Sequence, residues 1–350
     1  MSLSDVIEAL VDERGLEKEV LNDIVCEGML SAYEKRYPEL HFRVSLNKKT
    51  DSLVVESEKN IVSSVEDEDT QISLRKARGL DPKATTEQML WVPFEGAIGR
   101  IEILRAKQVI AQKIRQIESA AVYNEFKSKE GSILQGTIHK AERSGTMVKL
   151  QEYLAFLPKS LGIPGEKLPV GYPIRAMLKE VLEVPRNENQ LILDRSSDVF
   201  VEALFGLEIP EVFEKLVEIR KIVRIPGYKT KVAVSSNDSN IDPVGTCVGV
   251  GGVRIKPILK ELGNEKVDIV SWTSDIETLV RSSLKPAEIN RVELSDDGSF
   301  AQVWLDDDQR SLAIGKMGQN IALGAQLTGV KIELVQSDTK DLEQRLSEEL

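Results

Sequence analysis

Two stretches of this sequence decide its fold: Gly249-Val250-Gly251-Gly252 and Gly315-Lys316-Met317-Gly318. Each follows a short run of small and apolar residues, and an amphipathic helical pattern comes next, over residues 253–262 and 319–327. Two glycines around two other residues let a nucleic-acid backbone approach a junction between helices without a Cβ clash. The N–H groups at the start of the following helix then face phosphate.

The elements around the two loops occur in the same order twice. Each copy has a helix, two strands, a short helix, the glycine loop, another helix and a final strand, at residues 266–271 and 330–335. This is the order of a type II KH module, which clamps about four nucleotides at its G-x-x-G loop. A single G-x-x-G carries little information, but an internal repeat rarely arises by chance. We therefore expect two tandem KH domains, over residues 199–274 and 275–337.

The candidate RNA-binding residues lie in these loops and just after them. Neither loop has the spacing of a P-loop or of a dinucleotide fingerprint. Three cations, Arg254, Lys256 and Lys316, are placed to reach phosphate, although ordinary solvated cations would look the same. The full candidate set is Gly249, Val250, Gly251, Gly252, Arg254, Lys256, Gly315, Lys316, Met317, Gly318, Gln319 and Asn320.

A change of periodicity at Gly131 predicts a different domain before the KH modules, over residues 131–198. Five short β-prone runs are separated by turn signals such as Arg143-Ser144-Gly145. Five strands in so short a segment suit a closed barrel of the OB class, which binds oligonucleotides through one face. Tyr153 and Phe156 are its candidate base-stacking side chains, with a core position as the alternative. The runs cover residues 133–139, 146–150, 154–157, 174–181 and 190–193.

The N-terminal 128 residues have a mixed pattern that predicts an α/β domain with a long helix. Residues 1–35 read as helical, strand-like runs follow at 40–46, 52–56 and 70–75, and helical spacing returns over 99–127. The exposed face of the last helix carries Arg100, Arg105 and Lys107. This face and the acidic residues 5–27 are candidate protein-contacting surfaces, but solvated helix faces are common. The whole chain is thus expected to be a multidomain α+β protein.

Charge is unevenly distributed along the 350 residues. The formal net charge of −11 taken alone argues against a nucleic-acid partner. Between Arg220 and Lys260, however, eight basic residues stand against two acids, a local net of +6, whereas residues 5–27 hold eight acids and two bases. Because salt screens charges beyond about 8–10 Å, the local field is what a phosphate senses. Residues 338–350 are expected to form a short acidic tail.

Signals for catalysis, metals and membranes are weak. His41 and His139 are the only histidines, and neither has a Cys or carboxylate at metal-ligand spacing. Asp306-Asp307-Asp308 fits a helix N-terminus better than a metal site, and Cys247 fits a small core residue better than a nucleophile. Two distant cysteines, no signal peptide and no long apolar run predict a cytoplasmic protein. We expect no cofactor, no membrane contact and a monomer.

Residues 242–249 (DPVGTCVG) and 311–320 (SLAIGKMGQN) resemble those of the NusA family of bacterial transcription elongation factors. The resemblance extends to residues 229–234, 99–101 and 106–110 and covers essentially the whole chain. It implies an N-terminal domain that binds RNA polymerase near its RNA exit channel, an S1-type OB barrel and two KH domains. It also implies binding of nascent single-stranded RNA, contacts with other elongation or antitermination factors, and effects on pausing, termination and antitermination.

The sequence departs from the family pattern in three places. Gly251 stands where the family often has arginine, and Met317 where glycine or a basic residue is usual. The hairpin at residues 143–147 lacks the phenylalanine of strong S1 domains. Because stacking of one base on an aromatic ring contributes about 1–3 kcal/mol, we expect weak RNA binding by the barrel. The alternatives are an RNA-processing enzyme with KH and S1 modules, which places them in the opposite order, and a ribosome-associated RNA-binding protein.

Overall fold

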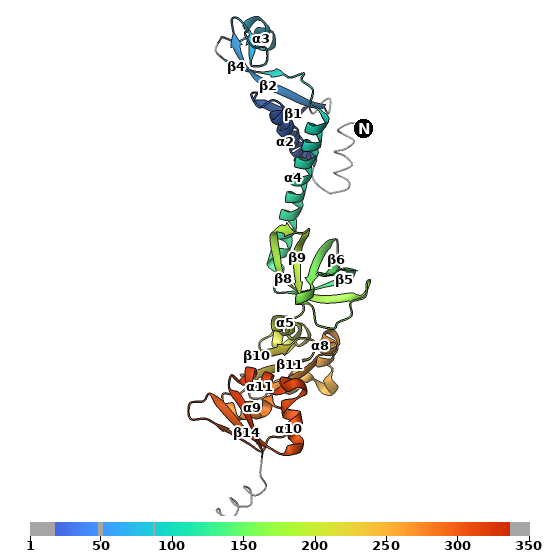
Figure 1. Cartoon of the computed structure of the whole chain (residues 1–350), viewed down its shortest axis with the longest axis vertical. Helices are drawn as coiled ribbons and strands as arrows, with labels where there is room; N and C mark the ends of the chain where they lie inside the picture. The colour runs from blue at the N-terminus through green and yellow to red at the C-terminus, as the bar shows by residue number, and fades with distance from the viewer. Residues whose placement is uncertain (1–17, 48–51, 87, 337–350) are drawn as a thin grey trace, which may run out of the picture. The chain divides into compact units, whose positions relative to one another are not determined.

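A computed structural model describes residues 18–47, 52–86 and 88–336 (Figure 1). The predicted helical pattern of residues 1–17 and the acidic tail at 338–350 lie outside the described residues. The chain divides into two compact units, residues 1–122 and residues 123–350.

The first unit pairs helices with one small sheet. Strand β2 is its longest strand; β1 and β4 pair with it antiparallel and β3 pairs with it parallel. Helix α2 buries Leu21, Ile24 and Val25 in one cluster with Ile114 of α4. The elements are α2 (Lys18–Arg36), β1 (Phe42–Asn47), β2 (Ser52–Val62), β3 (Gln71–Ser73), α3 (Leu74–Leu80), β4 (Met89–Pro93) and α4 (Arg100–Phe126), of which α4 continues into the second unit.

Two details of the first unit differ from the sequence prediction. The strand expected at 70–75 ends at Ser73, because the Ser73 hydroxyl accepts the Lys76 N–H (3.4 Å) and begins α3. Strand β4 was not predicted: its side chains do not alternate between buried and exposed, and only its pairing with β2 makes it a strand.

The second unit begins with a closed five-stranded barrel. Its strand order is β5-β6-β7-β9-β8, with β7 and β9 parallel and β8 closing antiparallel onto β5. This is the Greek-key order of an OB fold, so the prediction of an OB-type barrel is confirmed. The strands are β5 (Ile133–Ala141), β6 (Gly145–Leu150), β7 (Tyr153–Pro158), β8 (Pro173–Arg186) and β9 (Asn189–Asp194), with 3-10 turns η1 (Lys127–Lys129) and η2 (Lys159–Leu161).

Two modules of identical topology follow the barrel. In each, the first two strands pair antiparallel and the last strand pairs parallel with the middle one. The first comprises α5 (Asp198–Glu208), α6 (Pro210–Phe213), β10 (Val217–Ile225), β11 (Lys229–Ser236), α7 (Pro243–Val248), η3 (Val250–Gly252), α8 (Ile255–Leu262) and β12 (Lys266–Ser271). The second comprises α9 (Ile276–Ser283), β13 (Arg291–Leu294), β14 (Phe300–Leu305), α10 (Asp307–Ile314), η4 (Lys316–Gly318), α11 (Gln319–Thr328) and β15 (Lys331–Gln336). The predicted tandem KH fold is confirmed.

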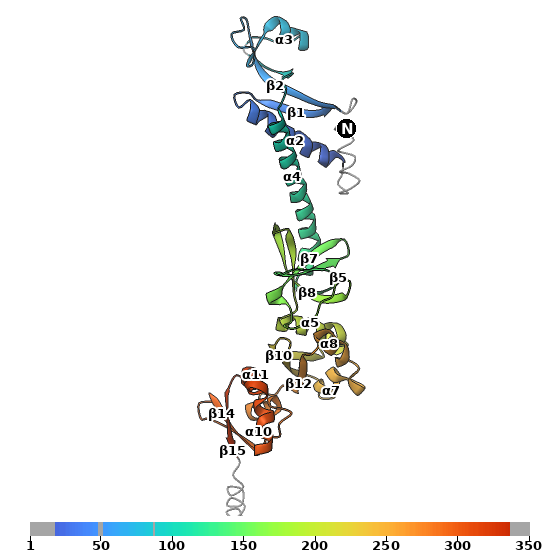
Figure 2. The same ribbon diagram turned by 45° about the vertical axis from the view of Figure 1, so that its right-hand side comes forward.

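Shared cores join the three parts of the second unit. Barrel residues Ile163 and Met177 belong to the same buried cluster as Phe200 and Leu204 of α5. Between the KH modules, Leu323 and Leu327 of α11 pack on the first module's sheet, where Val223 and Val270 are buried. Figure 2 shows α11 beside the end of β10. The barrel therefore packs against the first KH module, and that module packs against the second.

Candidate nucleic-acid interface

The two G-x-x-G loops adopt the same backbone conformation. Gly249 (φ 72°, ψ 165°) and Gly315 (φ 71°, ψ 178°) each end the preceding helix in a region of φ/ψ space that is essentially limited to glycine. Two residues later, Gly251 (φ 62°) and Met317 (φ 55°) both take left-handed values. Glycine holds that conformation without strain, whereas methionine is strained by roughly 1 kcal/mol or more.

Close packing adds a second requirement for the first glycine of each loop. A Cβ at Gly315 would lie 2.7 Å from the Asn320 Cβ, and one at Gly249 would lie 3.0 Å from the Arg254 Cγ. Each loop therefore folds directly onto the first turn of the helix that follows it. The tips point outward instead: Val250 is 95% exposed and Met317 is 86% exposed. The backbone at these tips is open to a ligand from solution.

Arg254 and Asn320 occupy equivalent positions, five residues after the first glycine. The Arg254 guanidinium donates to the Thr246 carbonyl (3.0 Å), and the Asn320 amide donates to the Leu312 carbonyl (3.2 Å). Both side chains thus tie the helix after the loop to the helix before it. Arg254 also pairs with Glu211 (2.8 Å), which neutralises its charge.

Asn320 requires a correction. Its side chain is only 2% exposed and donates further hydrogen bonds to the carbonyls of Ala313 and Leu284 (each 3.2 Å). It also accepts from the Lys229 ammonium of the first module (3.0 Å). Direct RNA contact by this side chain, as expected from the sequence, is therefore wrong, because all its polar atoms are engaged inside the protein. Asn320 positions the second loop.

The basic segment 220–260 also requires a correction, because much of its charge is internal. Arg224 pairs with Glu265 (2.8 Å), and both side chains are almost completely buried. Lys229 and Lys231 both contact Asp268, at 2.7 and 2.9 Å. Burial lowers the pKa of Lys231, and Asp268 opposes that effect. The sequence count missed these pairs because Glu265 and Asp268 lie beyond Lys260. The exposed cations that no carboxylate of the described residues pairs with include Lys256 and Lys260.

Two further candidates on the loops remain accessible. Lys316 is exposed at the tip of the second loop, and Gln319 is half-buried at the start of α11. In the first module, Gly251 is exposed and Gly252 is half-buried, with Lys256 just beyond them. The first loop thus carries Gly249, Val250, Gly251 and Gly252, with Lys256 in the first turn of α8. The second loop carries Gly315, Lys316, Met317 and Gly318, with Gln319 at the start of α11.

The two aromatic candidates in the barrel are less accessible. Tyr153 is half-buried, with its ring 5.1 Å from that of Phe126 in an edge-on contact. A hydrogen bond to Glu125 is the main cause of the raised pKa of Tyr153. Phe156 is half-buried beside Gly145, where a Cβ would lie 2.8 Å from its ring. Tyr172, which was not among the predicted residues, is 63% exposed. Its signal was an aromatic residue inside a turn sequence, Pro169-Val170-Gly171-Tyr172-Pro173, where it has no strand face to bury it.

The candidate protein-contacting residues of the first unit lie at the surface of α4. Arg100, Arg105 and Lys107 are exposed, and so are the apolar side chains of Ile101 (79%) and Leu104 (60%). Of these residues, Ile101, Leu104 and Arg105 line a hollow of about 430 Å³, together with Lys35, Arg36, Glu102 and Gln108. Mixed apolar and basic character makes this surface suitable for a protein partner.

The features considered for catalysis have structural roles here. Cys247 is fully buried, and this burial is the main reason that its pKa is raised to about 12. The thiolate form, which a nucleophilic cysteine needs, is therefore disfavoured. Asp306 stands at the N-cap position of α10, but its carboxylate accepts from the Asn290 amide (2.9 Å) rather than from the helix. Within the described residues, no three metal-binding side chains gather at one point. The helices of the same residues include none with the length and apolarity that crossing a membrane requires.

A closed OB-type barrel followed by two KH modules with matching G-x-x-G loops defines a multidomain protein of nucleic-acid-binding architecture. Family comparisons specify it further. Residues 2–120 match the NusA N-terminal domain, residues 195–272 the NusA-like first KH domain, and residues 276–342 the NusA-like second KH domain.

Curated relatives agree with these domain matches. The transcription termination/antitermination protein NusA of Thermus thermophilus is 34% identical over 98% of this chain and 92% of its own length. The protein of the same name from Bacillus subtilis is 32% identical over 97% of this chain and 92% of its own. The solved N-terminal domain of Bacillus subtilis NusA is 30% identical, covers 33% of this chain and 94% of its own, and superposes with a TM-score of 0.25. The chain belongs to the NusA family.

Proposed function

We propose that this protein is a transcription elongation factor that binds RNA polymerase and nascent RNA and so modulates pausing, termination and antitermination. Its family membership supports the transcriptional role. RNA binding is supported by the repeated G-x-x-G loop: two helix junctions have the same positive-φ backbone and exposed tips. We assign residues 1–128 to polymerase binding, 131–198 to the S1 domain, 199–274 and 275–337 to the KH domains, and 338–350 to a tail.

The loops bind RNA in slightly different ways. At the first loop, no side chain at the tip is charged, so phosphate meets the backbone N–H groups and Lys256 just beyond them. At the second loop, the Lys316 ammonium adds a cation at the tip itself. Bases lie in the grooves beside the loops, where apolar side chains receive them.

Loop variants test the RNA half. In Gly251→Asp and Lys316→Asp, a carboxylate stands where phosphate is expected, and aspartate tolerates the left-handed region better than most residues do. We expect each variant to bind single-stranded RNA about tenfold more weakly at fixed salt, and the double variant more weakly still. Fluorescence anisotropy measures the affinities.

Matched controls separate loop chemistry from total charge. Gly298→Asp changes an exposed glycine of similar φ (67°) with open space around it, in a turn remote from the G-x-x-G motif. Lys179→Asp repeats the lysine change on the barrel surface. Both controls should bind RNA within about twofold of the wild type. Unchanged affinity in the two loop variants and in their double would contradict the assignment.

The polymerase half is tested with charge reversals on α4. The triple variant Arg100→Glu, Arg105→Glu, Lys107→Glu should retain less RNA polymerase in a pull-down with the full chain, because all three cations are exposed. Arg75→Glu, Lys76→Glu, Lys83→Glu is a control with the same charge change on other exposed residues of the first unit. Recovery of ribosomal subunits without polymerase would favour a ribosome-associated protein, and degradation of labelled RNA in the presence of magnesium would favour an RNA-processing enzyme.

A further inference from the structure

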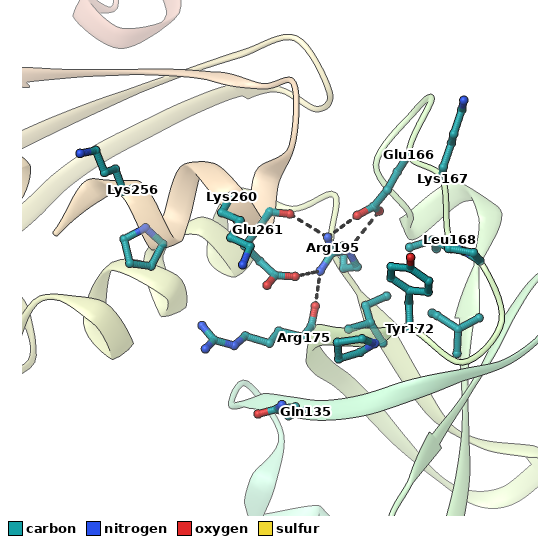
Figure 3. Close-up of a pocket in the computed structure, with 15 residues that line it drawn as sticks. Gln135, Glu166, Lys167, Leu168, Tyr172, Arg175, Arg195, Lys256, Lys260 and Glu261 are labelled. Atoms are coloured by element: carbon teal, nitrogen blue, oxygen red, sulfur yellow. Dashed lines mark hydrogen bonds and ion pairs between the residues drawn. The ribbon is translucent and has the colours of Figure 1, made fainter. Parts of the chain in front are cut away.

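The parts of the second unit are joined in series. Between the barrel and the first KH module, the Arg195 guanidinium pairs with the carboxylates of Glu166 and Glu261 (Figure 3). Between the two KH modules, α11 packs on the sheet of the first module. The sheet of the second module is the next surface in this series, and its outer face, the side away from the module's own helices, differs from that of the first.

In the first module, a helix covers the outer face of the sheet. The register of β10, β11 and β12 places Val223, Ala233 and Val270 on this face. The side chains of Leu323 and Leu327 of α11 pack on them. The two leucines are four residues apart and therefore lie on the same side of α11. A helix with leucines one turn apart is thus the cover that this kind of sheet takes in this protein.

In the second module, no helix of the described residues covers the outer face in this way. The register of β13, β14 and β15 places Phe300, Trp304 and Val335 on it. The opposite face is the one that packs on α9, α10 and α11, through Val303 and Ile332. Phe300, Trp304 and Val335 are half-buried, and neither cluster that contains residues of the second module includes them. Three apolar side chains therefore keep part of their surface in solvent.

Ion pairs border this apolar surface. Arg291 lies over the Trp304 ring, 5.2 Å from the ring centroid, and pairs with Glu293. Lys331 pairs with Glu333 (2.7 Å). Aromatic rings on an open sheet can stack on bases, but here each cation is already paired and two carboxylates would face the phosphates. The surface therefore favours an apolar protein segment over RNA.

The outer face of the second module is also more apolar than the face that α11 covers. Lys229 and Phe300 occupy equivalent positions, because each pairs with the first residue of the last strand of its module. Four residues further along the same strands, Ala233 corresponds to Trp304. Two aromatic rings thus replace a lysine and an alanine. A helix that covers this face removes more apolar surface from water than these two positions offer in the first module.

The sequence that follows β15 has the pattern of such a helix. Residues 337–350 read SDTKDLEQRLSEEL, and Leu342, Leu346 and Leu350 recur every fourth residue, like the two leucines of α11. The segment contains no glycine or proline. About five residues before Leu342 are enough for a connection between a strand and a helix. A helix of about ten residues is roughly 15 Å long, close to the length of a six-residue strand.

We propose that residues 338–350 form a helix that docks on the outer face of the second KH sheet, with Leu342 and Leu346 against Phe300 and Trp304. The segment then covers the second sheet as α11 covers the first. This interaction lies within one chain, and it holds whether or not the G-x-x-G loops bind RNA. Because an isolated helix of this length is marginal in water, packing on the sheet supplies its stability.

Leucine variants of the segment test the docking while the sequence of the module stays unchanged. In the full chain labelled with 5-fluorotryptophan, fluorine NMR follows Trp304, and Trp304→Phe assigns its resonance. The variant Leu342→Asp, Leu346→Asp should shift this resonance and make it more accessible to a soluble paramagnetic probe, whereas Trp91 and Trp272 should not change. The control Gln344→Asp, Ser347→Asp adds the same charge on the opposite side of the helix and should match the wild type. An unchanged Trp304 resonance in the leucine variant would overturn the proposal.

Ring variants of the sheet supply the reciprocal test, with the segment unchanged. Phe300→Thr, Trp304→Thr removes both rings and keeps residues that favour strands. Trypsin should cleave after Arg345 about tenfold faster in this variant, because cleavage follows the population of the undocked segment. Tyr172→Thr, which removes an exposed ring from the barrel, should leave the rate unchanged. Equal rates in the ring variant and the wild type would contradict the docking. Hydrogen exchange of the β14 amides checks the fold, and the leucine variant decides the question even if the ring variant unfolds.

Two other occupants of the face give different results. If the protection of Trp304 in the wild type is lost on dilution while sedimentation shows a dimer dissociating, a second copy covers the face and the proposal is wrong. If single-stranded RNA shifts the Trp304 resonance of the wild type, the face binds bases and the proposal is also wrong. Protection of Trp304 that is independent of protein concentration and of RNA, and that the leucine variant loses, is the result expected.

Discussion

The first and second KH modules share one backbone, but they support their loops with different side chains. Offset by 66 residues, Arg254 of the first corresponds to Asn320 of the second, and Cys247 corresponds to Ala313. A long cation that is about one-third exposed fixes the first loop, whereas a buried amide fixes the second. The comparison shows that the loop geometry is the common requirement, and that several side chains can meet it.

The strongest test of this comparison replaces the first glycine of each loop. Gly315→Ala places a Cβ against the Cβ of Asn320 in a backbone region that excludes other residues, so we expect its module to lose about 3 kcal/mol of stability. Gly249→Ala should lose less, about 2 kcal/mol, because the Arg254 side chain can move away. Hydrogen exchange of the amides in each module measures both. Equal losses would contradict the difference in packing.

The second test removes the side chains that support the loops. Asn320→Ala leaves buried carbonyls and the Lys229 ammonium without this partner, and we expect a loss of about 2 kcal/mol. Arg254→Ala should lose about 1 kcal/mol, since its guanidinium is partly exposed and water can replace it. Urea unfolding followed by module-specific exchange separates the two. A larger loss of stability in Arg254→Ala than in Asn320→Ala would contradict the conclusion that the buried amide supports its loop more strongly.

The third test exchanges Cys247 for the alanine that the second module has at that position. Cys247→Ala should lose about 1 kcal/mol at pH 7. Burial raises the pKa of Cys247 from 9.0 to about 12, so the folded thiol keeps a proton that the unfolded thiol releases. The stability that the buried Cys247 thiol contributes is therefore fully present below pH 9 and is lost as the pH rises toward 12. The difference between wild type and variant, measured by urea unfolding, should therefore shrink above pH 9; a constant difference would contradict the burial of the thiol.

The smallest expected effect concerns the strained residue of the second loop. Met317→Asn replaces methionine by a residue that tolerates a φ near 55°, so we expect a gain of about 0.5 kcal/mol in stability. RNA affinity should change less than about twofold, because Lys316 and the backbone are kept. Differential scanning calorimetry checks the gain. A loss of stability would mean that the Met317 side chain makes contacts that outweigh its backbone strain.

The periodicity and the paired loops predicted the domain order, the barrel and both KH modules, because these depend on local patterns and on repetition. Strand β4 and helix α3 were not predicted, since the first depends on pairing with distant β2 and the second on one serine cap. The glycines of the two loops could be predicted from the sequence, because a backbone with positive φ favours glycine and therefore leaves a visible G-x-x-G pattern.

The side chains of the candidate site were harder to predict. Asn320 reads as a surface residue beside a loop, and only the folded chain shows that it reaches Leu284 and Lys229, 36 and 91 residues away. Lys229 and Lys231 read as part of a basic patch, although Asp268 pairs with both. Tyr172 was missed because a search for barrel aromatics favours strands, whereas this ring lies in the turn before β8.

The central claim, that one chain couples polymerase to nascent RNA, is tested most directly by single-round transcription through a pause site and a terminator. The wild type should change pause duration and termination efficiency. The Gly251→Asp, Lys316→Asp double variant should lose that effect while it still associates with polymerase, and the α4 triple variant should lose it while it still binds RNA. A double variant as effective as the wild type would contradict the account.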